Sequence, residues 1–140
     1  MAFRIPKPLS PQAHRVLDLI ALPGLFTLTL WLRGRNTTAA TVVLTNALIE
    51  GATQLATDYT PRARPRGNLR WLSLRDHLRI TAVYGGFLAG VGMTLTGLRT
   101  QDRRLILALA ASAPVLAALT DSGESQRPRD VRRWTYVPPS

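Results

Sequence analysis

Residues 80–98 read ITAVYGGFLAGVGMTLTGL and contain no charged side chain. Three further apolar blocks accompany this one, at residues 16–32, 39–57 and 105–120. A helix on the surface of a soluble bundle has one apolar stripe and one charged face, and these blocks show no such division. Each block approaches the length of about 17–25 residues that a bilayer-spanning helix requires. The pattern predicts an all-α fold, a transmembrane bundle of four helices.

Charge placement predicts how these helices are oriented. The 140-residue chain has a formal net charge of +10 and no cysteine, which excludes disulfides and thiolate metal sites. Basic residues gather in the N-terminal segment, in a central loop at residues 59–79 and in a polar tail at residues 122–140. Four spans put these three segments on one side, so the positive-inside rule predicts a bacterial inner-membrane protein with both termini cytoplasmic. The same rule accounts for the basic loop, so we expect the lipid bilayer as a partner and no nucleic acid.

The chain also aligns with itself. An offset of 63 residues, the separation of His14 and His77, places residues 9–60 on residues 72–123 without gaps. Leu-Ser precedes both histidines at the same distance, and Thr-Asp closes both units. Each unit contains two blocks, so the copies share one orientation. The sequence therefore predicts a single membrane domain of two tandem helical hairpins, related as a parallel repeat by a pseudo-twofold axis along the membrane normal.

Several short motifs point to a known family. In chain order they are the pair His14 and Asp18, Pro23-x-Leu25-Phe26, Thr57-Asp58-Tyr59, and a second Leu-Ser-x-x-x-His that ends at His77. With these motifs most of the chain resembles the SPW-repeat type of small bacterial membrane protein. The resemblance implies a four-helix membrane fold and no established activity. The first block, which contains Asp18 and lacks a small-residue cleavage site, is expected to be a retained helix and not a signal peptide.

A polar stripe interrupts the second block. Asn46, Glu50 and Gln54 follow one another at four-residue spacing and so share one helix face. An ionisable group within a membrane span is expected to face the bundle interior and to have a partner. We interpret the stripe as a hydrogen-bonding contact between helices, with a proton or ion site at Glu50 as the alternative.

The two histidines and two aspartates form a second polar set. His14 and His77 lie at the starts of helices, and Asp58 and Asp121 at the ends, which is the opposite of what helix dipoles favour. Pairing each histidine with an aspartate would offset the unfavourable interaction of both groups with the helix dipoles. We therefore expect these pairs to act as a structural clamp that holds the helices together. Proton handling and axial ligation of haem by His14 and His77 are the alternatives.

Small residues mark a helix-packing face in the third block. Ala82, Gly86 and Gly90 are spaced by four residues, and small side chains let helices approach closely in lipid. Contact within the chain is the preferred interpretation, and contact with a partner subunit is the alternative.

The residues indicate no enzyme. The chain lacks a glycine-rich phosphate loop, a nucleophile elbow and metal-ligand spacing, so we expect no metal site. The leading hypothesis is therefore a non-catalytic accessory or scaffolding subunit of a larger membrane complex, with no cofactor. A carrier of haem or another cofactor through His14 and His77, and a small proton or ion transporter using Glu50, are the alternatives.

Overall fold

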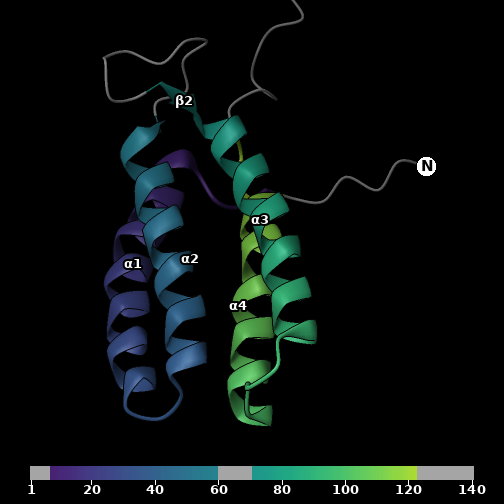
Figure 1. Cartoon of the computed structure of the whole chain (residues 1–140). Helices are drawn as coiled ribbons and strands as arrows, with labels where there is room; N and C mark the ends of the chain where they lie inside the picture. The colour runs from purple at the N-terminus through teal and green to yellow at the C-terminus, as the bar shows by residue number, and fades with distance from the viewer. Residues whose placement is uncertain (1–6, 60–70, 123–140) are drawn as a thin grey trace, which may run out of the picture.

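The computed structural model describes residues 7–59 and 71–122, which fold into two helical hairpins standing side by side (Figure 1). The first hairpin consists of α1 (Pro11–Arg33) and α2 (Thr37–Ala56), and the second of α3 (Leu74–Thr94) and α4 (Thr100–Leu119). Strands β1 (Thr57–Asp58) and β2 (Leu72–Ser73) lie at the end opposite the hairpin turns. The predicted all-α class is confirmed for the described residues. Much of the basic loop and nearly all of the polar tail lie outside them.

The repeated Leu-Ser dipeptide starts the first helix of each hairpin. The Ser10 hydroxyl accepts a hydrogen bond from the Ala13 amide at 3.1 Å, and the Ser73 hydroxyl accepts one from the Asp76 amide at 3.2 Å. Serine is a favoured N-cap because its oxygen satisfies an amide that has no partner within the helix. The cap explains why α3 begins before the predicted apolar block at residue 80: helix formation starts at the capping serine and includes the charged residues that follow it.

Short parallel pairings connect the two hairpins. At the end of α2, β1 pairs with β2, with Thr57 opposite Leu72. At the end of α4, Thr120 forms a parallel bridge with Leu9, supported by hydrogen bonds from the Leu9 amide to the Leu119 carbonyl and from the Asp121 amide to the Leu9 carbonyl. The end of α2 thus pairs with the segment that precedes α3, and the end of α4 pairs with the segment that precedes α1.

The two hairpin turns contact each other at the opposite end. Asn36 caps α2 by accepting from the Ala39 amide at 3.1 Å, and its amide nitrogen donates to the Gly97 carbonyl at 3.1 Å and to Asp102 at 2.9 Å. The backbone φ of Gly97 is +84°, a left-handed conformation that glycine adopts without strain. This turn contact fixes the first hairpin against the start of α4.

The apolar core lies in the half of the bundle that includes the turns. Its buried members come from all four helices: Leu32, Ala39, Ala40, Val43, Leu88, Ile106 and Ala110. Among the described residues, one helix, α1, is long and apolar enough to cross a membrane on length and composition. The other half of the bundle contains most of the buried polar groups.

Two of the three small residues in the predicted helix-packing face do not meet another helix of the chain. Beta-carbons built at Gly86 or Gly90 would have no neighbour within 4 Å, whereas Ala82 lines a pocket with Pro114, Ala117 and Ala118 of α4. The close approach uses Gly85, where a β-carbon would lie 2.8 Å from the Ala110 carbonyl oxygen of α4. Glycines fall on two adjoining faces of α3, and their spacing alone does not distinguish the face that meets α4.

We expect Gly85→Ala to lower the free energy of unfolding by about 1–2 kcal/mol, because overpacking outweighs the gain in helix propensity. The added methyl group would meet backbone, which cannot rotate away as a flexible side chain can. Gly86→Ala is the matched control and should be neutral or slightly stabilising, because its methyl group meets open space. Chemical denaturation of the purified chain in a mild detergent measures both. Equal effects at the two positions would contradict this packing assignment.

Candidate functional site

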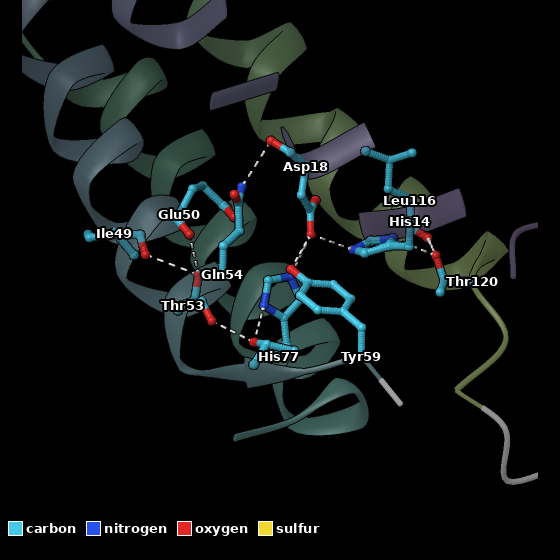
Figure 2. A network of polar contacts seen from close by, with 11 residues as sticks. His14, Asp18, Ile49, Glu50, Thr53, Gln54, Tyr59, His77, Leu116 and Thr120 are labelled. Carbon is cyan, nitrogen blue, oxygen red and sulfur yellow. Dashed lines mark hydrogen bonds and ion pairs between the residues drawn. The ribbon is translucent and has the colours of Figure 1, made fainter. Parts of the chain in front are cut away.

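A cluster of polar side chains, in which two histidines are buried and the others half-buried, occupies the end of the bundle away from the turns (Figure 2). His14 and Asp18 come from α1, one helical turn apart, and His77 comes from the first turn of α3. Tyr59 follows β1 and lies across the cluster. The two capped helix starts and the parallel strand pair therefore position these four side chains together, although they come from both hairpins.

Each histidine contacts a threonine at the end of the other hairpin. His14 Nδ1 lies 2.8 Å from the Thr120 hydroxyl, and His77 Nδ1 lies 3.0 Å from the Thr57 hydroxyl. Both imidazoles and both threonines are at most 2% exposed. The 63-residue offset that relates His14 to His77 also relates Thr57 to Thr120. The two contacts are therefore equivalent in the predicted repeat.

The positions of Asp58 and Asp121 at the helix ends predict that each pairs with a histidine. The structure places the preceding residue of each, Thr57 or Thr120, against the imidazole. These residues lie in extended backbone, where successive side chains point to opposite sides, so only one residue of each Thr-Asp pair can face the histidine.

Asp18 is the carboxylate that approaches both histidines. Its Oδ2 atom lies 3.5 Å from His14 Nε2 and 3.7 Å from His77 Nε2, and it accepts a hydrogen bond of 2.6 Å from the Tyr59 hydroxyl. The Asp18 backbone carbonyl accepts a further hydrogen bond from Gln54. The spacing of His14 and Asp18 by four residues was the available sequence signal, because it puts both side chains on one helix face.

The atoms in this cluster have the chemistry of metal ligands. One ligand atom each from His14, Asp18 and His77 can be chosen so that all three lie within 4.8 Å of one another. Both Nε2 atoms are buried and form no hydrogen bond with any described residue. The imidazole rings are nearly perpendicular, with their centroids 5.6 Å apart.

A cavity of about 270 Å³ extends from the cluster between the two hairpins, and residues of all four helices line it. The predicted polar stripe of Asn46, Glu50 and Gln54 faces this cavity. Thr81, which occupies the position of Asp18 in the second repeat unit, also lines it, and its buried hydroxyl forms no hydrogen bond within the described part of the chain. A second pocket of about 550 Å³, between α1 and α2, reaches Asp18 and Tyr59.

These features define an all-α chain of two helical hairpins with a buried His/Asp cluster and a polar-lined cavity between them. Comparison with protein-family models, with curated proteins and with solved structures found no match to this chain. Its possible functions must therefore be argued from the residues and their geometry.

The contact between Tyr59 and Asp18 makes stability depend on pH in the alkaline range. Burial, followed by the hydrogen bond to Asp18, raises the pKa of the Tyr59 phenol well above its usual range. Because the folded state holds this proton more tightly than the unfolded chain, the stabilisation is complete below about pH 10 and is lost as the pH rises further. We expect Tyr59→Phe to lower the free energy of unfolding by about 1.5 kcal/mol at neutral pH.

The same variant tests the pH dependence. Denaturation of the parent chain above about pH 10 should show a decline in stability that Tyr59→Phe reduces. Trp71→Phe is a control, because Trp71 is exposed and its side chain does not titrate. An identical alkaline decline in the parent chain and in Tyr59→Phe would show that another group is responsible.

Proposed function

We propose that the chain is an integral membrane protein whose four helices all span the bilayer. The main supporting observation is that α1 buries polar side chains and exposes large apolar ones. Its buried residues are His14, Thr29 and Leu32, two of which are polar, whereas large apolar side chains such as Ile20 and Leu30 are 67% and 69% exposed. A water-soluble bundle would bury the apolar set, and lipid tails satisfy it without burial.

The other helices have the same character. Leu55 on α2 is 78% exposed, Val83 and Phe87 on α3 are 76% and 63% exposed, and Val115 on α4 is 55% exposed. Large apolar side chains exposed in such numbers are typical of a surface that contacts lipid or another protein. Its presence on every helix favours a lipid-facing bundle over a single docking surface.

The proposal includes the parallel repeat and the orientation. The equivalent contacts of His14 with Thr120 and His77 with Thr57, together with the two parallel strand pairings, support a pseudo-twofold axis between the hairpins. The distribution of arginine supports a cytoplasmic location for both termini. The His/Asp cluster then lies at the cytoplasmic end of the bundle and the hairpin turns at the other.

Cysteine labelling tests both spanning and orientation, because the chain has no native cysteine. A membrane-impermeant maleimide should label Ser122→Cys only in inside-out vesicles and Arg99→Cys only in right-side-out vesicles. Arg99 is the N-cap residue of α4, but its side chain forms no capping hydrogen bond. Its substitution therefore leaves the start of the helix intact. Labelling of both positions from one side would refute the four-span arrangement.

Within the membrane we propose a non-catalytic accessory role, as a subunit of a larger complex. The support is that the cluster joins the two hairpins through hydroxyl–imidazole and hydroxyl–carboxylate contacts. The described hydroxyls that contact the histidines, those of Thr57 and Thr120, are fully buried and donate to backbone carbonyls, so neither is placed to attack a substrate as a nucleophile would. Native gels of membranes solubilised in mild detergent should show the chain in a species much larger than its own 15.4 kDa. Migration as a lone chain would count against a stable complex.

A second candidate function, proton or ion transfer, is favoured by one observation. Glu50 faces the cavity between the hairpins, where His14 and Asp18 also lie, so two carboxyl groups and an imidazole share one cavity. Proton flux into proteoliposomes should then fall when Glu50 is replaced by glutamine. Gln54→Glu is the control: it keeps a carboxyl group in the cavity, so flux should persist. Flux that is equal in liposomes with and without protein would dismiss this candidate.

The geometry argues against the haem alternative. The Asp18 carboxylate lies between the two Nε2 atoms, at 3.5 and 3.7 Å from them. A porphyrin plane would have to occupy the same space, between two imidazoles that are fully buried.

A further inference from the structure

The protonation of both histidines follows from their threonine partners. The Thr120 hydroxyl donates its hydrogen to the Leu116 carbonyl at 2.7 Å, and the Thr57 hydroxyl donates to the Thr53 carbonyl at 2.5 Å. A hydroxyl has one hydrogen to donate, so each threonine oxygen accepts from the neighbouring imidazole Nδ1–H. Each neutral imidazole therefore has a lone pair on Nε2.

Three acceptor atoms then face one another in a buried space. The two Nε2 lone pairs approach Asp18 Oδ2 at 3.5 and 3.7 Å, too far for a hydrogen bond, and neither has a donor among the described residues. Buried acceptors without a donor are costly, and a cation placed between the two Nε2 atoms and the Asp18 carboxylate would satisfy both imidazoles.

We propose that His14, Asp18 and His77 bind one divalent transition-metal ion. With metal–ligand bonds of about 2.0–2.1 Å, tetrahedral ligand atoms lie about 3.3 Å apart. The two distances from Asp18 Oδ2 to the imidazole nitrogens, 3.5 and 3.7 Å, are close to this value, and all three ligand atoms lie within 4.8 Å of one another, so metal binding would draw the imidazoles together. Two imidazole nitrogens with one carboxylate suit Zn²⁺ and its first-row neighbours, whereas Mg²⁺ and Ca²⁺ favour oxygen ligands alone.

The surrounding groups orient these ligands as in known metal sites. Thr120 and Thr57 hold the imidazoles through Nδ1, and Tyr59 holds the carboxylate, so every ligand has an outer partner. The pocket between α1 and α2 reaches Asp18 and supplies a path for entry.

The central cavity leaves room for a fourth ligand. It adjoins His14 and Asp18, and the Thr81 hydroxyl that lines it has no described partner. A water or an anionic group held by Thr81 would complete the coordination. The ion would link α1 to α3 and so join the two hairpins. The inference rests on the contacts alone and holds whether or not the helices span a bilayer.

Competition titration of the full chain tests the site. The chain is purified in mild detergent, freed of any histidine tag and treated with a chelator, and Zn²⁺ is added against a chromophoric competitor. We expect one Zn²⁺ per chain, and Co²⁺ should give the visible d–d absorption of a four- or five-coordinate ion. His77→Ala and Asp18→Asn should each weaken Zn²⁺ binding by at least about 100-fold.

Two further variants separate ligand loss from misfolding. Asp76→Asn removes an exposed carboxylate next to His77 in the sequence and should leave the affinity unchanged. Thr57→Val keeps all three ligands and should weaken Zn²⁺ binding by about 10–100-fold, because His77 alone loses the outer partner that orients its imidazole. A parent chain that binds no Zn²⁺ at micromolar free ion, or equal affinities in the parent and His77→Ala, would overturn the proposal. Helical circular dichroism of each variant confirms that the compared chains are folded.

Discussion

Replacing Asn36 with alanine should lower the free energy of unfolding by about 2–4 kcal/mol. Asn36 caps α2 through the Ala39 amide and donates to Asp102 and Gly97, so one side chain serves both hairpins. Asp102 is only 3% exposed, and alanine would deprive its buried carboxylate of this donor. Chemical denaturation in mild detergent measures the loss.

A double-mutant cycle isolates the contact between the hairpins. Asn36→Asp keeps the capping oxygen but removes the donor, so its cost reports the contact with Asp102 and Gly97. Combining it with Asp102→Asn restores a hydrogen bond with donor and acceptor exchanged. We expect the double variant to be more stable than the sum of the single effects, by about 1–3 kcal/mol. Strict additivity would show that Asn36 acts only as a cap.

The helices were the part of the fold most accessible from sequence. Apolar blocks with at most one charged residue each locate four helical segments, and the repeated Leu-Ser dipeptide contains the serines that cap α1 and α3. The apolar blocks did not locate the start of α3, because α3 begins with a polar turn that includes Asp76 and His77. Hydropathy reports the environment of a helix, and capping reports where it begins.

The packing of α3 shows a limit of spacing arguments. Gly86 and Gly90 satisfy the small-residue motif, and Gly85 makes the close approach. Adjacent positions on a helix differ by about 100° in direction, so a choice between them requires knowing where α4 lies. That information resides in tertiary contacts, which the motif does not contain.

The site was only partly predictable. The 63-residue offset relates both histidines and both Thr-Asp ends, but it does not indicate which residue of each Thr-Asp pair faces the imidazole. Asp18 breaks the repeat, since Thr81 stands at its equivalent position. One carboxylate therefore faces two histidines, an asymmetry that a symmetric interpretation of the sequence excludes.

The hydroxyl groups at the two hairpin ends should contribute equally to stability. Thr57→Val and Thr120→Val each replace a hydroxyl group with a methyl group of similar volume. The buried imidazole Nδ1–H then loses the threonine oxygen that accepts from it. We expect each variant to lose about 2–3 kcal/mol of free energy of unfolding. Thr41→Val is the matched control, because the Thr41 hydroxyl is exposed and donates only within its own helix, and its effect should stay within about 0.5 kcal/mol.

The double variant Thr57→Val/Thr120→Val tests whether the two ends belong to one network. Both histidines approach the same carboxylate oxygen of Asp18, so freeing one imidazole changes the surroundings of the other. We therefore expect a total loss of about 4–6 kcal/mol with a measurable departure from additivity. A loss at only one of the two positions would contradict the equivalence of the two threonine–imidazole contacts.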